Sequence, residues 1–196
     1  MRSAIKTLIL TSIFYNLSAS LIGPLWATYV GTVGGGIQGA TSAWAVYSFF
    51  VGFLILVFGR LGDRLNKKVM FVYGQFMNFI GTTGFLFVSN LFQLYVVQGI
   101  LGISAAILSP SLNSLYGRNV QRGKESSQWS YLSGSVNIIF AVATFLTGAI
   151  VAVYGFQTLF LIMSANALIA LLVSLAFVKT KLKGEIDFLE GKRVKK

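Results

Sequence analysis

Few side chains in this sequence can carry out covalent or acid–base chemistry. The 196 residues include no histidine and no cysteine, and only five are aspartate or glutamate. Without histidine and cysteine there is no Ser-His or Cys-His nucleophile pair and no cysteine-based metal site. Five acidic residues leave little for carboxylate catalysis. We therefore expect neither an enzyme nor a bound metal or other cofactor.

The remaining polar residues lie on uncharged stretches, at spacings typical of a helix face. Asn16 and Ser20 are one turn apart, and Trp44, Tyr47 and Ser48 follow an i, i+3, i+4 pattern, so each set shares one side of a helix. The rings of Trp44 and Tyr47 could stack on a sugar or a drug-like solute. Two other roles stay open, because polar groups also form interhelical hydrogen bonds and Trp44 also suits an interface anchor.

These polar residues are set in six apolar segments. Hydrophobic residues make up 55% of the chain and charged residues 11%, whereas about 25% of a soluble domain is charged. A helix needs about 20 largely apolar residues to cross a bilayer, and six stretches qualify: 7–30, 42–58, 69–88, 91–116, 131–153 and 157–178. We predict an all-α membrane protein, with a six-helix bundle over residues 1–178 and a basic cytoplasmic tail over 179–196.

The chain has a net charge of +11, and its charged residues all lie outside the six apolar segments. Connections 31–41, 89–90 and 154–156 hold no charged residue, and all 16 lysines and arginines lie in the N-terminus, the other two connections and the tail. This alternation is the positive-inside pattern, and it places both termini in the cytoplasm of a multi-pass protein in the cytoplasmic (inner) membrane. The charge therefore indicates orientation and not a nucleic-acid partner. The tail either lies on the anionic inner leaflet or leads into further sequence.

The two prolines mark an internal repeat. The stretches 18–25 and 104–111 read Ser-Ala-Ser-Leu-Ile-Gly-Pro-Leu and Ser-Ala-Ala-Ile-Leu-Ser-Pro-Ser, an offset of 86 residues. The same offset lays the second segment over the fifth and the third over the sixth. Three helices used twice give an inverted repeat, as in secondary transporters. We also expect Pro24 and Pro110 to break the first and fourth helices.

The connection between the second and third segments carries the most specific pattern. Residues 59–68 read Gly-Arg-Leu-Gly-Asp-Arg-Leu-Asn-Lys-Lys. They resemble the signature loop of the major facilitator superfamily, G-x-x-x-D-[RK]-x-G-[RK]-[RK]. The matching residues are Gly59, Asp63, Arg64, Lys67 and Lys68, while Asn66 replaces the second glycine. The resemblance implies that this loop is a charge-relay latch between the cytoplasmic helix ends of two transporter halves.

Local chemistry suggests a part for several residues of this loop. We expect Gly59 to let two helix ends approach closely, and Asp63 to interact with the exposed N–H groups of the third helix. Elsewhere, glycines recur at seven-residue spacing, which predicts close helix packing; these pairs are Gly52 and Gly59, Gly74 and Gly81, and Gly148 and Gly155.

Two weaker resemblances to the same family bear on energy coupling. Residues 91–99 are similar to the family pattern l-x-x-x-R-x-x-Q-G, but Tyr95 replaces the arginine that the family associates with proton coupling. Residues 148–161 resemble the turn from helix 5 to helix 6, and Thr144 and Phe145 stand where antiporter-type members have Gly-Pro. No charged residue falls inside any of the six segments. We therefore expect transport of small neutral or hydrophobic solutes, without proton coupling.

The resemblance also implies a cavity and a partner. Members of the family have two six-helix bundles that face each other across a cavity lined by helices 1, 2, 4 and 5 of each bundle. This chain supplies one bundle, so we expect a homodimer or a complementary half, and alternating access as the mechanism. A channel or a non-transporting scaffold subunit are the alternatives. The candidate cavity residues are Asn16, Ser20, Trp44, Tyr47, Ser48, Gln98, Ser109, Asn113, Asn137 and Thr144.

Overall fold

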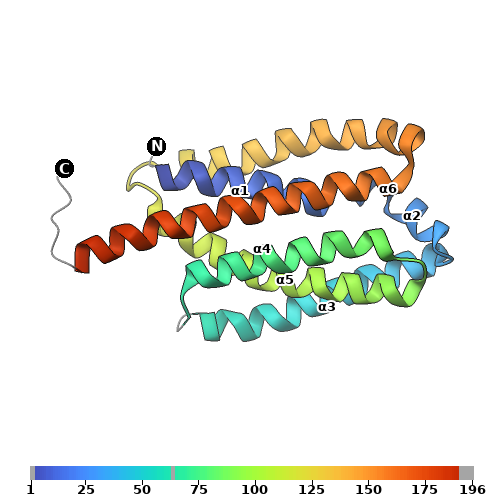
Figure 1. Ribbon diagram of the computed structural model, residues 1–196, viewed down its shortest axis with the longest axis horizontal. Helices are drawn as coiled ribbons and strands as arrows, with labels where there is room; N and C mark the ends of the chain where they lie inside the picture. Colours follow the sequence, from blue (N-terminus) through green and yellow to red (C-terminus); the bar gives the residue numbers. More distant parts are fainter. Residues whose placement is uncertain (1–2, 63–64, 190–196) are drawn as a thin grey trace.

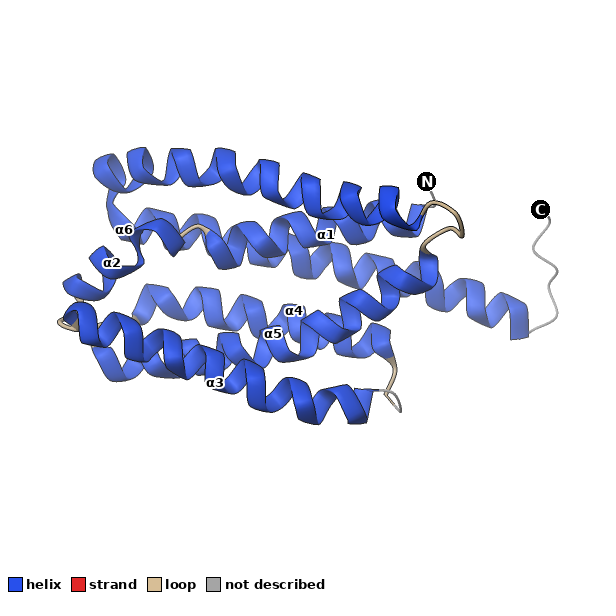
Figure 2. Cartoon of the chain, turned by 180° about the vertical axis from the view of Figure 1, so that it is seen from behind, coloured by secondary structure: helices blue, strands red, loops and turns tan. Residues whose placement is uncertain are grey.

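The computed structural model describes residues 3–62 and 65–189, with side chains for 5–59 and 65–178. Within these residues the chain is helical throughout and has no strand, which confirms the all-α class (Figure 2). The elements, in chain order, are α1 (Ser3–Ser20), the 3-10 turn η1 (Gly23–Leu25), α2 (Trp26–Thr32), α3 (Gly36–Gly62), α4 (Lys67–Gly84), the 3-10 turn η2 (Phe85–Phe87), α5 (Leu91–Asn119) and α6 (Glu125–Leu189).

The last two predicted segments form a single element, α6. Its backbone leaves the helical conformation at Gly155, with φ 77° and ψ 175°, which glycine adopts far more readily than other residues. The chain turns back on itself there (Figure 1), and we call residues 125–154 the first arm and 156–189 the second arm. Because no loop separates the arms, the described chain has five long helices where six were expected. The second arm also continues past the predicted end at 178.

The two prolines behave differently. Pro24 lies in η1, which separates α1 from α2, so the first predicted break is present. Pro110 lies inside α5, which runs from Leu91 to Asn119, so the predicted second break is wrong. The hydroxyl of Ser111 donates to the carbonyls of Ile107 and Leu108, each at 2.9 Å. Such hydroxyl bonds help a membrane helix to continue through a proline.

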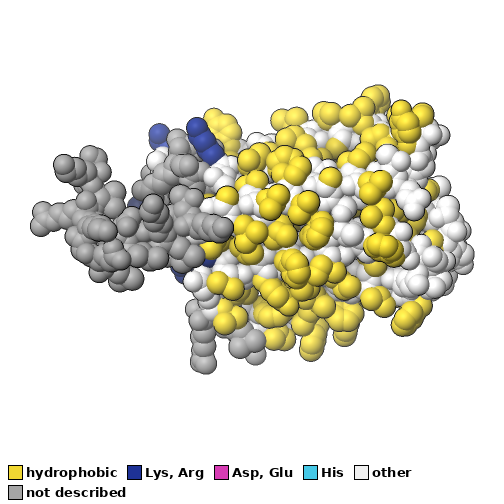
Figure 3. Space-filling view, in the orientation of Figure 1, with side chains coloured by type: hydrophobic (Ala, Val, Ile, Leu, Met, Phe, Trp, Pro, Cys, Tyr) yellow, Lys and Arg dark blue, Asp and Glu magenta, His cyan; other side chains and the backbone are white. Residues whose placement is uncertain are grey.

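One end of the bundle collects the charged connections. The start of α1, the junction of α3 and α4, the junction of α5 and α6, and the far end of α6 lie together (Figure 1). Lysine and arginine side chains gather at this end, and hydrophobic side chains cover the rest of the visible face (Figure 3). We call it the charged end, and the opposite end, which holds Ser89 and Gly155, the uncharged end.

Four helical stretches of the described chain are long and apolar enough to cross a membrane: Ile5–Thr32, Gly36–Gly59, Leu91–Asn119 and Glu125–Val178. The last is long enough for two crossings, with Gly155 between them. The α4 helix does not meet this criterion. It carries the amides of Gln75 and Asn78, both of which are buried within the bundle.

Close packing by glycine is confined to one of the three predicted pairs. A Cβ at Gly74 would meet Leu108 at 2.6 Å, and one at Gly81 would meet Leu101 at 2.6 Å, so α4 and α5 approach closely. Nothing lies within 4 Å of such an atom at Gly52, Gly59 or Gly148. Within this chain those three glycines do not serve helix packing, because their faces have no neighbouring helix.

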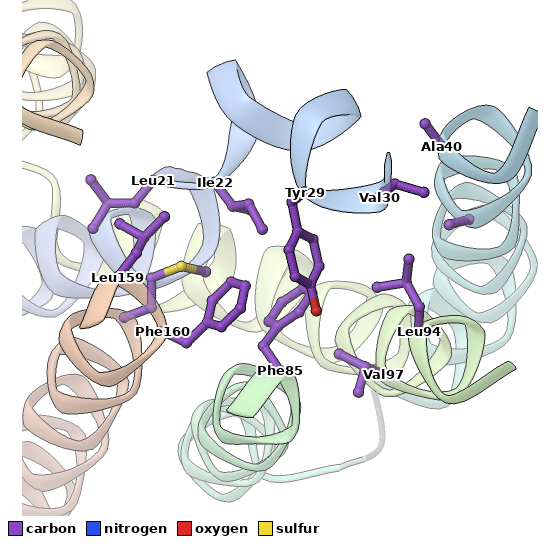
Figure 4. Close-up of a cluster of buried hydrophobic side chains, with 12 residues drawn as sticks. Leu21, Ile22, Tyr29, Val30, Ala40, Phe85, Leu94, Val97, Leu159 and Phe160 are labelled. Carbon is purple, nitrogen blue, oxygen red and sulfur yellow. The ribbon is translucent and has the colours of Figure 1, made fainter. Parts of the chain in front are cut away.

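An apolar core lies toward the uncharged end. The ring of Tyr29 from α2 packs against Phe85 of η2 and Phe160 of the second arm (Figure 4). The Tyr29–Phe160 ring centroids are 4.8 Å apart and the Phe85–Phe160 centroids 5.1 Å. A second cluster, around Phe71, Tyr116 and Phe177, lies toward the charged end. Between the two clusters the bundle is hollow.

Candidate functional site

Two neighbouring cavities are lined mainly by residues of α1, α3, α4 and α5, and the central one also by Trp26 of α2 and Phe140 of α6. The central cavity is open on one side, where Trp44 is 53% exposed. The central cavity has a volume of about 360 Å³. The inner cavity, of about 320 Å³, is lined by residues that lie nearer the charged end of each helix, such as Ser12, Ile55 and Asn113. Tyr15, Asn16 and Tyr47 line both. These three side chains are therefore part of the wall of both cavities.

Aromatic rings form one wall of the central cavity. The ring centroids of Trp26 and Trp44 are 6.1 Å apart, and those of Trp44 and Tyr47 are 5.4 Å apart. The indole N–H of Trp26 donates to the carbonyl of Ala40 at 3.0 Å, which fixes the ring between α2 and α3. Since such rings present flat, polarisable faces, this wall suits a planar apolar surface.

Side-chain amides provide the polar groups of the central cavity. Asn16 donates to the carbonyl of Ser12 at 2.7 Å, and Asn78 donates to the hydroxyl of Ser18 at 2.8 Å. Gln98, which is 3% exposed, makes no side-chain hydrogen bond within the described residues. The amide group of Gln98 is therefore available to a solute, as are the carbonyl oxygens of Asn16 and Asn78.

The inner cavity contains a further amide. Gln75 on α4 is 1% exposed, and its Oε1 atom is buried without a hydrogen-bond partner among the described residues. Ser109 and Asn113 reach the same cavity from α5. No charged side chain of the residues that the structure describes lines either cavity. The two cavities thus present aromatic faces, amides and hydroxyls, which suit binding and not acid–base chemistry.

The structure brings together most of the polar residues that the sequence suggested. Seven of the ten candidates line the cavities: Asn16, Ser20, Trp44, Tyr47, Gln98, Ser109 and Asn113. The other three do not. Ser48 is exposed on α3, and Asn137 is exposed on α6 and donates to the carbonyl of Ser133 in its own helix at 2.8 Å. The hydroxyl of Thr144 is buried without a partner, away from both cavities.

Other residues link the helices. None of the ten candidates makes a hydrogen bond to another helix within the described part of the chain, so that alternative role is not seen for them. Interhelical side-chain bonds include those of Asn78 to Ser18 at 2.8 Å, Tyr95 to Ser42 at 2.7 Å, Thr83 to Ser164 at 2.6 Å, and Ser104 to the carbonyl of Gly74 at 2.9 Å. Tyr95 therefore ties α5 to α3 at the position where the family pattern has arginine.

Sequence reasoning missed several polar and aromatic residues that line the cavities, among them Tyr15, Trp26, Gln75 and Asn78. Two of them had a visible signal, because Gln75 and Asn78 are amides three residues apart in an otherwise apolar stretch. That spacing places them on one helix face. The third segment was left out because it does not correspond to a cavity-lining helix of the family.

The loop over residues 59–68 is described only at its edges. Asp63 and Arg64 lie outside the described residues, so the predicted latch and the cap from Asp63 remain predictions. The structure shows a different cap, because the side chain of Asn66 accepts a hydrogen bond from the Lys68 N–H at 2.9 Å. Lys67 begins α4 and Lys68 is buried there. Gly59 is exposed near the end of α3.

An apolar helical bundle around an uncharged, partly polar interior is the architecture of a multi-pass membrane protein that accommodates a small solute. The chain belongs to the major facilitator superfamily, whose family model matches residues 8–195. It is therefore a protein of a transporter family and not an enzyme.

Curated relatives are similar over most of this chain. The multi-drug resistance efflux pump PmrA of Streptococcus pneumoniae is 25% identical over 166 residues, which cover 83% of this chain and 41% of the relative. The multidrug resistance protein MdtG of Proteus mirabilis is 26% identical, with coverages of 81% and 40%. Multidrug resistance protein 2 of Bacillus subtilis is 25% identical, with coverages of 94% and 46%. The chain therefore spans less than half the length of these relatives.

Solved structures share the fold. The POT family transporter PepTSo superposes with a TM-score of 0.80 at 13% sequence identity, over 91% of this chain and 38% of that one. A peptide transporter POT crystallised with sulfate gives a TM-score of 0.79 at 18% identity, over 97% and 44% of the two chains. At these identities the likeness concerns the arrangement of the helices alone.

Proposed function

We propose that this chain is one bundle of a transporter that moves small neutral or hydrophobic solutes by alternating access. The observation that carries the proposal is the pair of neighbouring cavities, which among the described residues are lined by aromatic rings and amides and by no charged side chain. An uncharged lining favours solutes without formal charge, because a buried ion there would have no counter-charge. Three relatives are named as multidrug resistance proteins, which supports drug-like solutes as candidates.

The transmembrane arrangement is part of the proposal. Six crossings follow if α1 with α2, then α3, α4, α5 and the two arms of α6 each span the bilayer once, as two inverted repeats of three. The charged end then faces the cytoplasm with both termini, in accordance with the positive-inside rule. Clustering of lysine and arginine at that end supports this orientation (Figure 3).

A second bundle completes the transport path. The central cavity is bounded by this chain on one side, and the relatives are more than twice as long as the matched region. We propose a homodimer related by an axis along the membrane normal, and a complementary half is the other arrangement. Crosslinking in nanodiscs followed by mass measurement distinguishes the two, because only a homodimer yields a species of twice the chain mass from this chain alone.

Solute counterflow tests the transport function. The purified chain is reconstituted in liposomes loaded with an unlabelled neutral aromatic solute, and uptake of the labelled solute is followed. A carrier gives a transient accumulation that exceeds equilibrium, whereas a channel gives simple equilibration. A scaffold subunit gives neither. Equilibration, or no flux across a panel of neutral aromatic and sugar-like solutes, would contradict the proposal.

A pH gradient tests the coupling. Within the described part of the chain, no aspartate, glutamate, lysine or arginine lines either cavity, and Tyr95 bonds to Ser42 where a coupling arginine would stand. We therefore expect the initial rate of uptake to change by less than about 2-fold when an inward proton gradient is imposed. Strong stimulation that a protonophore abolishes would show that protons drive transport.

A further inference from the structure

Gln98 on α5 is a buried amide whose two polar atoms remain accessible. Its side chain is 3% exposed and makes no hydrogen bond within the described residues. In the described chain, the side-chain atoms that are fully enclosed without a partner belong to Tyr29, Gln75 and Thr144. Neither Oε1 nor Nε2 of Gln98 is among them, so both atoms keep some accessible surface. The space that Gln98 lines is the central cavity, and its amide therefore opens there.

Contacts between α5 and α3 place Gln98 level with the aromatic wall of the cavity. Both helices run from the uncharged end to the charged end (Figure 1). The hydroxyls of Tyr95 and Ser42 form a hydrogen bond of 2.7 Å. Further along, a Cβ at Gly102 would meet the carbonyl oxygen of Tyr47 at 2.8 Å. Because Gln98 lies between these two contacts on α5, it stands beside the part of α3 that carries the aromatic wall.

The amide of Gln98 differs from the other polar groups of the central cavity. Asn16 and Asn78 each already donate an N–H to a group of the protein, and a hydroxyl such as that of Ser20 carries a single hydrogen. A primary amide presents an N–H donor and a carbonyl acceptor side by side in one plane. The complementary solute group also has a donor and an acceptor side by side, as a lactam or a carboxamide has.

The charge and the size of the cavity narrow the class of solute further. No charged side chain of the described residues lines the central cavity, so a carboxylate or an amidinium would be buried without a counter-charge. The volume of about 360 Å³ falls within the range of about 300–1,000 Å³ typical of ligand pockets. We propose, on the basis of the transport function above, that Gln98 determines specificity for neutral planar aromatic solutes that carry a lactam or a carboxamide.

In this arrangement the two parts of the solute have separate partners. The ring lies against the aromatic wall, where the ring centroids of Trp44 and Tyr47 are 5.4 Å apart. The solute N–H donates to Oε1 of Gln98, and the solute carbonyl accepts from Nε2. A solute without the N–H keeps the stacking and the second hydrogen bond but loses the first.

Three neutral bicyclic probes test this specificity on the full chain in nanodiscs. The lactam 4-methyl-2-quinolinone has the N–H, 4-methylcoumarin has a ring oxygen in its place, and 1,4-dimethyl-2-quinolinone has a methylated nitrogen. Affinities are measured by displacement of tritiated 4-methyl-2-quinolinone. We expect the lactam to bind about 3- to 10-fold more tightly than either analogue, because the analogues cannot donate to Oε1.

Variants of Gln98 assign the preference to its side chain. Gln98→Met keeps a similar volume and removes both polar atoms, so the affinities for the lactam and for 4-methylcoumarin should become equal. Gln38→Met is the matched control, because Gln38 is exposed on α3 and lines neither cavity; it should keep the preference of the unchanged chain. Partitioning of each probe into lipid is the same for every variant, so it cancels from this comparison.

Each outcome supports or overturns the role of Gln98. Equal affinities of the unchanged chain for the lactam and 4-methylcoumarin would overturn it, as would a preference that survives in folded Gln98→Met. If Gln98→Met does not fold, the same criterion applies to Gln98→Leu. Absence of saturable lactam binding also overturns the role. Counterflow of a neutral solute that persists without any lactam preference would leave the transport function standing, whereas loss of counterflow as well would remove both.

Discussion

Trp44 and Ser48 lie one turn apart on α3, but only Trp44 lines the central cavity. We expect Trp44→Ala to raise the KM for an aromatic solute by about 10-fold, because an aromatic contact is lost. Ser48→Ala should leave the KM within about 2-fold, since Ser48 is exposed and makes no side-chain hydrogen bond in the described chain. Counterflow kinetics of the two variants give both values, and equal effects would show that Trp44 does not contact the solute.

The hydrogen bond between Asn78 and Ser18 joins α4 to α1 deep in the bundle. Both residues are at most 1% exposed, so water cannot replace the lost bond. Polar contacts between membrane helices contribute about 0.6 kcal/mol on average. We expect a coupling free energy of about that size in a double-mutant cycle of Ser18→Ala and Asn78→Ala, measured by unfolding in mixed micelles. Strictly additive effects would show that the bond contributes nothing to stability.

The spacing of polar residues showed which of them share one side of a helix. It did not show, for every helix, whether that side is turned toward a cavity. Asn16, Ser20, Trp44 and Tyr47 were found because their spacing and their helices both indicated a cavity. Ser48 lies on the same side of α3 as Trp44 but does not line the cavity, because only part of that side faces it. Gln75 required knowledge of which side of α4 packs on α5, and Gly74 and Gly81 determine that side through contacts with distant residues.

The reversal within α6 depends on one glycine. Gly155 has φ 77° and ψ 175°, a conformation that costs other residues about 1–3 kcal/mol. Gly155→Ala should therefore lower the free energy of unfolding by that amount, as measured by thermal or SDS-induced unfolding. Gly148→Ala is the matched control: Gly148 lies in the helical part of the first arm, and an added Cβ meets nothing within 4 Å. Its effect should be neutral or slightly stabilising.

The two prolines show that a helix break cannot be predicted from the residue type alone. The sequence correctly indicated a break at Pro24, but the same logic failed at Pro110 in α5. The helix continues through Pro110, and next to it the Ser111 hydroxyl donates to the carbonyls of Ile107 and Leu108. The turn at Gly155 alone was also not predicted. The uncharged residues 154–156 are compatible both with a short connection, which was expected, and with a turn at a single residue.

The two ends of the bundle differ in charge, and this difference predicts which side of the membrane each faces. Because the chain has no cysteine, a single introduced thiol reports its own location. We expect Arg122→Cys, at the exposed charged end, to resist a membrane-impermeant maleimide in intact cells and to react after permeabilisation. Ser89→Cys, exposed at the uncharged end, should react in intact cells. The opposite labelling pattern would invert the proposed topology.

At the scale of the whole molecule, the family and the fold class could be predicted well, because both depend on patterns along the chain. Alternating charged and uncharged connections, the loop over 59–68 and the apolar segments need no knowledge of packing. The expected partner bundle could not be tested in the same way. Among the described residues, nothing lies within 4 Å of a Cβ added at Gly52, Gly59 or Gly148, so a second molecule or lipid is left to cover these positions.

The single-residue joint at Gly155 has a consequence for how the chain enters its membrane. The arms on either side have no spacer that could remain in water while one arm inserts alone. We therefore expect the arms of α6 to partition into lipid together, as a helical hairpin, once the ribosome has released both. A chain truncated shortly after Gly155 would then leave its first arm poorly integrated.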